Sequence, residues 1–174
     1  DVAIAHWLVL DTVPGGLLES GADSLVARAA PGTRRMAMVT SWTGQQYNPA
    51  AIRALASNTP ALAQLARTVA HRASELGLTG LVLDFQGHPR ADLDLLVRVS
   101  RAIADSARAR GASQVVIAVP AGDTAAYPAQ PLRAAADLIL VMLYDEHRSG
   151  TSPGPVASPG WVSRNLDVRI AEVG

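Results

Sequence analysis

The sequence predicts an α/β domain built on a parallel β-sheet. Apolar, β-compatible runs alternate with helix-like segments along the chain. The runs are continuously apolar, instead of alternating between apolar and polar residues. Continuous apolar runs are typical of strands that are buried on both faces, and a regular β-α-β alternation is typical of a parallel sheet covered by helices.

Five segments have the composition of strands, and each ends at a polar residue, a proline or a turn signal. The expected strands are Val2–Leu10, residues 35–40, Gly80–Asp84, residues 115–119 and residues 138–143. A closed barrel of eight strands typically needs about 200 residues or more. The 174 residues of this chain therefore predict about five strands and no complete barrel.

Helical segments are expected between these strands, and capping residues mark several of them. Pro49 occupies the favoured first position of a short helix, Asn58 or Thr59 caps the next one, and Gly77 and Gly111 follow two helix ends. The expected helices are residues 17–30, Pro49–Ser57, residues 60–76, residues 89–110, residues 131–136 and residues 161–173. A Pro-Gly-Gly turn is expected at residues 14–16.

Composition excludes several classes of protein. Formal net charge is zero and the 15 arginines are scattered, which argues against a nucleic-acid partner. No apolar run approaches the roughly 18 residues of a membrane span, so no membrane insertion is expected. There is no cysteine, the four histidines lie far apart, and no glycine-rich phosphate loop occurs. We therefore expect one domain, residues 1–174, with no metal and no cofactor.

Polar and aromatic side chains recur just after the predicted strands. Parallel α/β proteins place their functional sites at this edge of the sheet, because the carboxyl ends of the strands meet there. The residues at these ends are Asp11, Ser41, Trp42, Asp84, Gln86, Asp123, Tyr144 and Asp145. They predict a polar cleft formed by several loops.

Two of these strand ends carry a family resemblance. Residues 79–86 read Thr-Gly-Leu-Val-Leu-Asp-Phe-Gln, and residues 142–145 read Met-Leu-Tyr-Asp, followed by a Pro-Gly-Pro loop and Trp161. In order and separation these blocks resemble glycoside hydrolase family 18, the chitinase-like barrels, and in particular its bacterial peptidoglycan and spore-cortex branch. The family motifs are Asp-Gly-x-Asp-x-Asp-x-Glu and Met-x-Tyr-Asp. Gln86 stands where the family has its catalytic glutamate, and Thr79 and Val82 replace two acids.

The resemblance implies a partial or divergent (β/α)8 TIM-type barrel with a parallel sheet and outer helices. It implies that the chain runs from the second strand of such a barrel to the helix after the sixth, as an incomplete barrel or a fragment of a longer chain. The implied partner is a glycan that contains N-acetylglucosamine, of the peptidoglycan or chitin type. Other domains of a longer polypeptide are further implied partners, and an extracellular or cell-envelope location is favoured.

The resemblance also implies a substrate-assisted mechanism, an exception to the scheme with two carboxylates. In it the 2-acetamido oxygen of the sugar attacks its own anomeric carbon, a glutamate protonates the leaving oxygen, and an aspartate two residues earlier orients the acetamido group. Residues at i and i+2 of a strand point to the same side, so Asp84 and Gln86 are expected to reach one ligand. Tyr144 and Asp145 complete the implied catalytic set, but the amide of Gln86 cannot act as a general acid.

The side chains expected to bind substrate are Trp42, Phe85, Asp123, Tyr144 and Trp161. Each of the aromatic residues also fits a packing role.

The sequence is compatible with three alternative functions. The first is a glycan-recognising domain with impaired hydrolysis. The second is an active or weakly active glycosidase that uses another acid, with Glu146 or Asp123 as the donor. The third is a structural or protein-interaction module without a ligand.

Overall fold

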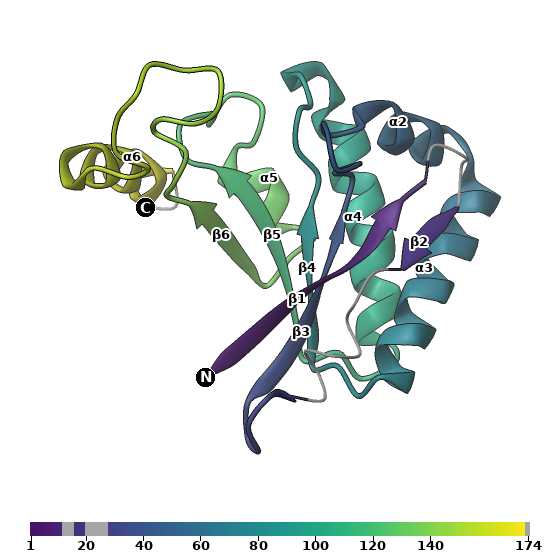
Figure 1. Ribbon diagram of the computed structural model, residues 1–174. Helices are drawn as coiled ribbons and strands as arrows, with labels where there is room; N and C mark the ends of the chain where they lie inside the picture. The colour runs from purple at the N-terminus through teal and green to yellow at the C-terminus, as the bar shows by residue number, and fades with distance from the viewer. Residues whose placement is uncertain (12–15, 20–27, 173–174) are drawn as a thin grey trace.

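The computed structural model describes residues 1–11, 16–19 and 28–172 as a six-stranded sheet with helices packed against it (Figure 1). The strand order is β2-β1-β3-β4-β5-β6. β2 is antiparallel to β1, and every other pair is parallel. The strands are β1 (Val2–Leu10), β2 (Leu17–Glu19), β3 (Arg34–Thr40), β4 (Gly80–Asp84), β5 (Gln114–Pro120) and β6 (Leu138–Met142). The predicted α/β class with a mainly parallel sheet is confirmed.

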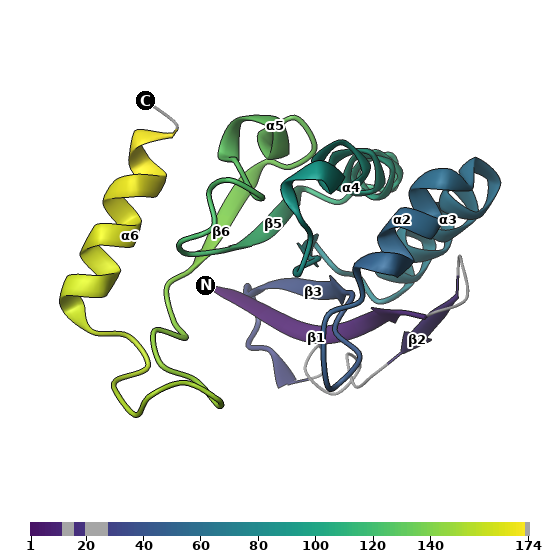
Figure 2. The same cartoon turned by 90° about the horizontal axis from the view of Figure 1, so that it is seen from above.

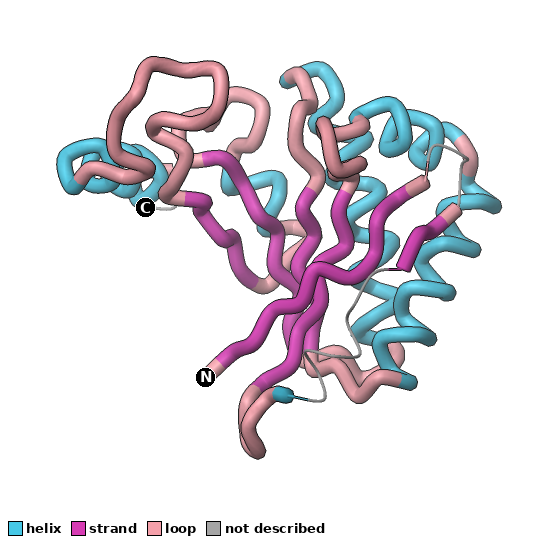
Figure 3. Tube along the Cα trace, viewed as in Figure 1, coloured by secondary structure: helices cyan, strands magenta, loops and turns pink. Residues whose placement is uncertain are grey.

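The helices lie mainly on one face of the sheet, as the view from above shows (Figure 2). The helices are α2 (Pro49–Ser57), α3 (Thr59–Glu75), α4 (Leu93–Arg108), α5 (Ala129–Arg133) and α6 (Pro159–Ala171). A short 3-10 turn, η1 (Arg90–Asp92), precedes α4. Helices α2 to α5 cover the sheet, whereas α6 lies apart from them, beyond β6 (Figures 1 and 3).

Apolar side chains fill both faces of the central strands. The main core lies between the sheet and helices α2 to α5. A smaller cluster occupies the opposite face and comprises Met36, Val82, Val116 and Ala118. All five residues of β4 are buried. This burial on both faces explains why the strands read as continuous apolar runs.

Strand β4 approaches β5 so closely that Gly80 has no space for a side chain. A Cβ at this position would overlap the carbonyl oxygen of Gln114 and lie 2.8 Å from Cε of Met36. At the other end of the strand, Asp84 is in register with Thr40 of β3. The pairing therefore places the polar end of β4 beside the polar end of β3.

One predicted helix is wrong where the structure describes it. Residues 17–30 were expected to be helical, but Leu17–Glu19 forms β2 and pairs with Leu8, Val9 and Leu10 of β1. The hydrogen-bonding edge of β1 is a tertiary feature that overrides the weak helical spacing of this segment. Residues 20–27 of that helix, and residues 14–15 of the predicted turn, lie outside the described residues.

Other predicted elements are confirmed with small changes at their ends. The helix expected at residues 89–110 begins as η1 and continues as α4, the helix expected at 131–136 is Ala129–Arg133, and the strand expected at 138–143 ends at Met142. The sheet is not closed, since β2 and β6 form its two edges in the described chain. This geometry is compatible with a partial barrel.

Candidate functional site

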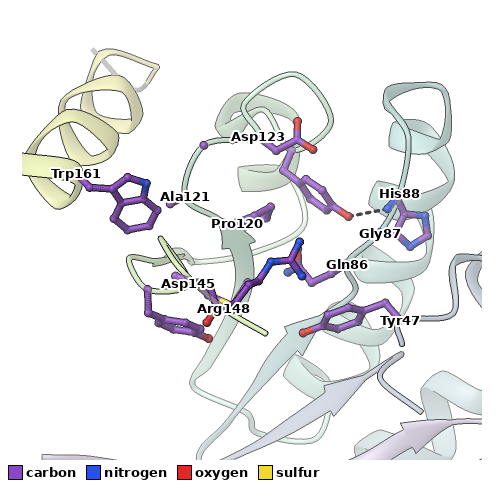
Figure 4. A pocket seen from close by; sticks show the side chains of 14 residues that line it. Tyr47, Gln86, Gly87, His88, Pro120, Ala121, Asp123, Asp145, Arg148 and Trp161 are labelled. Atoms are coloured by element: carbon purple, nitrogen blue, oxygen red, sulfur yellow. Dashed lines mark hydrogen bonds between the residues drawn. The ribbon is translucent and has the colours of Figure 1, made fainter. Parts of the chain in front are cut away.

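The carboxyl ends of β4, β5 and β6 form a cleft of about 460 Å³ (Figure 4). Trp161 lies on the side of the cleft opposite Tyr47 and Gln86. The residues that line the cleft are Tyr47, Gln86, Gly87, His88, Pro120, Ala121, Gly122, Asp123, Tyr127, Met142, Tyr144, Asp145, Arg148 and Trp161. The cleft therefore gathers loops from widely separated parts of the sequence.

Asp84 is 5% exposed and does not line the cleft itself, but its carboxylate is hydrogen-bonded to two residues that do, Tyr47 and Gln86. Its Oδ2 accepts a hydrogen bond from the hydroxyl of Tyr47 at 3.0 Å and lies 3.1 Å from the hydroxyl of Thr40. Its Oδ1 accepts from Nε2 of Gln86 at 3.0 Å. Both carboxylate oxygens are thus satisfied by protein donors, as a buried charged group requires.

Gln86 lies beside Asp84 and is 6% exposed. Besides its bond to Asp84, its Nε2 donates to the backbone oxygen of Ala118 on β5 at 2.9 Å. Both hydrogens of the amide are used in this way, and the two acceptors are oxygens with no hydrogen to give. Gln86 therefore couples Asp84 to the neighbouring strand.

Alternation along the chain after β4 explains why Asp84 and Gln86 lie on one side and Phe85 on the other. The ring of Phe85 is 2% exposed and belongs to the main core. Phe85 does not line the cleft. Its position gives it a packing role, although the sequence predicted that it binds substrate.

Tyr144 and Asp145 follow β6 and both line the cleft. Tyr144 is 51% exposed. Burial of the rest of its ring, followed by the charges of Asp84 and Asp145, raises the pKa of its hydroxyl. Asp145 has a φ of 70°, a conformation that is uncommon for residues other than glycine. The turn at this residue directs the chain from β6 into the loop beside the cleft.

The two tryptophans expected to contact sugar occupy different places. Trp161 lies in the first turn of α6, where its backbone N–H donates to the capping hydroxyl of Ser158 at 3.4 Å, and it lines the cleft. Trp42 lines a separate hollow with His6 and Gly44. Its ring packs edge-on against Tyr47 with 5.0 Å between ring centroids. Tyr47 therefore lies between the cleft and Trp42.

The ionisation of Tyr47 reflects its surroundings. Burial of the ring raises the pKa of its hydroxyl, and the neighbouring groups Asp84, Tyr144 and Asp145 act in the same direction. The hydroxyl is therefore a hydrogen-bond donor to Asp84 at neutral pH. The structure thus brings the predicted residues Asp84, Gln86, Tyr144 and Asp145 together around this tyrosine.

Asp123 and Glu146, the two candidate substitutes for the missing proton donor, differ in their position relative to the cleft. Asp123 lines the cleft and uses its Oδ1 to accept from the backbone N–H of Ala126 at 3.0 Å. Glu146 does not line the cleft. Its carboxylate accepts from the backbone N–H and the hydroxyl of Ser158, and the backbone bond lowers the pKa of Glu146. A carboxyl with a lowered pKa is ionised at neutral pH, so Glu146 is unsuited to donate a proton.

Three residues that shape the cleft were not singled out from the sequence for this role. Tyr127 accepts a hydrogen bond from the backbone N–H of His88 at 2.8 Å, and burial raises the pKa of Tyr127 to about 12. Arg148 lines the cleft from the loop after β6. Arg169 of α6 is buried and donates to the backbone oxygens of Pro120, Ala121 and Tyr127. In the sequence, a buried arginine on a helix cannot be distinguished from an arginine whose side chain is exposed to solvent.

His88 is buried beside the cleft, with Nδ1 3.5 Å from Oδ2 of Asp92. Burial lowers the pKa of His88, and the nearby Asp92 only partly opposes this effect.

Within residues 1–11, 16–19 and 28–172, no group of three or more His, Asp or Glu side chains is arranged to hold a metal ion. No described helix is both long enough and apolar enough to cross a membrane.

The sheet and the cleft at the carboxyl ends of its strands define the class. The chain has the fold of the chitinases of glycoside hydrolase family 18, and the resemblance predicted from the sequence is confirmed at the level of the fold. No family model matches the sequence.

Among the curated proteins, the candidate sporulation-specific glycosylase YdhD of Bacillus subtilis is 28% identical over 144 residues, which are 79% of this chain and 34% of YdhD. Its crystal structure matches with a TM-score of 0.82 at 23% identity, over 98% of this chain and 59% of that one. The spore cortex-lytic enzyme SleL of Bacillus cereus matches with a TM-score of 0.86 at 14% identity, over 98% of this chain and 40% of SleL.

A family 18 chitinase from Cycas revoluta matches with a TM-score of 0.78 at 18% identity, over 98% of this chain and 57% of that one. It was solved with two substitutions, one of them glutamate to glutamine, in complex with four N-acetylglucosamine units. The present chain thus spans about a third of the curated relative and roughly half of these solved chains.

Proposed function

We propose that this chain is a single family 18-type domain that recognises glycans containing N-acetylglucosamine, of the peptidoglycan or chitin type, with impaired hydrolysis. The observation that carries the proposal is the position of Gln86. It lies in the cleft of a family 18 fold, two residues after Asp84, and its amide is bonded to Asp84 and to the Ala118 carbonyl.

Impaired hydrolysis follows from the chemistry of the amide. A general acid must give up a proton to the leaving oxygen, and such catalysis is commonly worth about 10²- to 10⁴-fold. The amide of Gln86 holds no acidic proton, and its two hydrogens are engaged with other oxygens. Of the two substitutes, Glu146 is bonded to Ser158 outside the cleft, which leaves Asp123 for the alternative of a weakly active glycosidase.

Glycan recognition is supported by the lining of the cleft and by the similar proteins. Tyr144 and Trp161 offer aromatic surface to a sugar ring, and Asp123 and Asp145 offer acceptors for hydroxyl groups. The Cycas revoluta chitinase holds four N-acetylglucosamine units although one of its glutamates is replaced by glutamine. We propose the same class of ligand for this chain, contacted by Gln86 and these four residues.

Calorimetric titration with tetra-N-acetylglucosamine tests the proposal. We expect binding by the wild type, at least fivefold weaker binding by Trp161→Ala, which is about the effect of losing one ring contact, and no detectable turnover. Trp42→Ala is the matched comparison, because Trp42 lines a separate hollow. Equal losses for both variants would extend the binding surface to Trp42.

Gln86→Glu tests the assignment of the lost acid. The new side chain would face the carboxylate of Asp84 and the Ala118 carbonyl, so it would be held in its protonated form, which is what a general acid requires. We expect turnover of a chromogenic chitooligosaccharide to rise by about 10²-fold or more. Turnover by the wild type that Asp123→Asn abolishes would instead establish the weakly active glycosidase. Absence of binding to chitooligosaccharides and muropeptides would favour the module without a ligand.

A further inference from the structure

Arg148 brings a positive charge into the cleft. It lines the cleft from the loop after β6, and its guanidinium lies beside Gln86 (Figure 4). Among the described residues, no hydrogen bond or ion pair involves this guanidinium, although the carboxylates of Asp123 and Asp145 line the same cleft. The carboxylate of Asp123 is directed away from Arg148 (Figure 4). The N–H donors of the guanidinium, of which arginine has five, therefore remain available to a ligand.

The loop that carries Arg148 is held by its own hydrogen bonds. The hydroxyl of Thr151 accepts from the backbone N–H of Arg148 and donates to its backbone oxygen, both at 2.9 Å. Further along, the backbone N–H of Glu146 donates to Val156 at 2.9 Å, and the carboxylate of Glu146 accepts two hydrogen bonds from Ser158. A side chain on such an ordered loop binds a ligand at a smaller cost in backbone entropy.

Tyr127 supplies a second free donor to the cleft. It lines the cleft and is 2% exposed. Its oxygen accepts from the backbone N–H of His88 at 2.8 Å, and among the described residues no acceptor is bonded to its hydroxyl hydrogen. A buried donor without an acceptor is unfavourable, so a ligand oxygen at this point would satisfy it.

A carboxylate is the ligand group that fits an unpaired guanidinium best. It accepts two parallel hydrogen bonds from the planar group, and these bonds are stronger than those to neutral acceptors. Chitin carries only neutral groups. N-Acetylmuramic acid, the second sugar of peptidoglycan, keeps the acetamido group and adds a lactyl ether that ends in a carboxylate when no peptide is attached.

We propose that Arg148 determines the specificity of the cleft, and that it selects peptidoglycan strands whose N-acetylmuramic acid has a free lactyl carboxylate. This inference rests on the proposed glycan recognition and names the substrate class within it. The charges of Asp123 and Asp145 oppose an anion in the same cleft. The selectivity therefore depends on direct contact with the guanidinium, and not on the overall field of the cleft.

Two tetrasaccharides that differ in one kind of group test the inference. The first alternates N-acetylglucosamine with N-acetylmuramic acid and has free lactyl carboxylates. The second is its methylamide, in which each carboxylate has become a neutral amide. In calorimetric titration of the whole chain at about pH 7, where a carboxylate is ionised, we expect at least about fivefold tighter binding of the first, as for one charge-assisted contact at an exposed site. This preference should shrink when salt rises from about 50 to about 300 mM.

Arg148→Gln removes the charge and keeps a side chain that can form hydrogen bonds. It should abolish the preference for the carboxylate form. Arg101→Gln is the matched control, since Arg101 is exposed on α4 and does not line the cleft. It should leave the preference unchanged.

The outcomes separate the inference from the proposed function, with tetra-N-acetylglucosamine as a third ligand. Equal binding of the two tetrasaccharides, a preference that survives Arg148→Gln, or an equal loss in Arg101→Gln would overturn the role of Arg148. Binding of the methylamide or of tetra-N-acetylglucosamine would then leave glycan recognition standing. If none of the three glycans binds, both the inference and the proposed function fail.

Discussion

Arg169 is expected to hold α6 and one wall of the cleft in place. It is the one described residue of α6 that is buried, at 4% exposure, while Leu166, Val168 and Ile170 of the same helix are exposed. Its guanidinium donates to Ala121 at 3.1 Å, to Tyr127 at 2.7 Å and to Pro120, and it forms an ion pair with Glu172 at 2.8 Å. A polar anchor thus replaces the usual apolar contact face of a helix.

Arg169→Met keeps the apolar part of the side chain and leaves three backbone oxygens without their donor. An unsatisfied buried acceptor costs about 1–3 kcal/mol, and water in the cleft can replace part of the loss, so we expect a total of about 3 kcal/mol. Urea denaturation measures this loss globally, and hydrogen exchange of residues 159–171 measures it if α6 opens locally. Arg164→Met, at an exposed position of α6, should cost no more than about 0.5 kcal/mol. Equal effects of the two variants in both measurements would refute the anchor.

Two further predictions concern strand packing and pH. Gly80→Ala should cost about 3 kcal/mol in thermal unfolding, because its methyl group would meet the backbone of β5. Gly160→Ala, where the new atom meets only the end of a long side chain at 3.4 Å, should stay within about 0.5 kcal/mol. Burial lowers the pKa of His88 below the ordinary value of about 6.5, so the unfolded chain binds more protons between the two values. Stability should therefore fall as the pH decreases through this window, by up to about 1.4 kcal/mol per pH unit. Urea titrations at several pH values should show a flatter dependence for His88→Gln, and an unchanged slope would contradict the assignment.

Much of the fold was predictable because local patterns and burial agree in the central strands. β1, β3, β4, β5 and β6 all follow from continuous apolar runs, and Asn48 and Asn58 cap α2 and α3 through their side chains. β2 was missed because three residues are too short to show a period, and its pairing depends on the edge of β1. Interactions between distant segments decide such short strands.

Strand alternation and residue type are enough to predict that Asp84 and Gln86 share one side of a strand end and that Gln86 carries no acidic proton. The direction in which the amide faces depends on the folded chain, because the oxygens that orient it belong to Asp84 and to Ala118 on another strand. The folded chain also places Phe85 in the core, Trp42 outside the cleft and the arginine anchor of α6 beneath the cleft wall. These features arise from contacts between residues far apart in the chain, and no local pattern of residue types records such contacts.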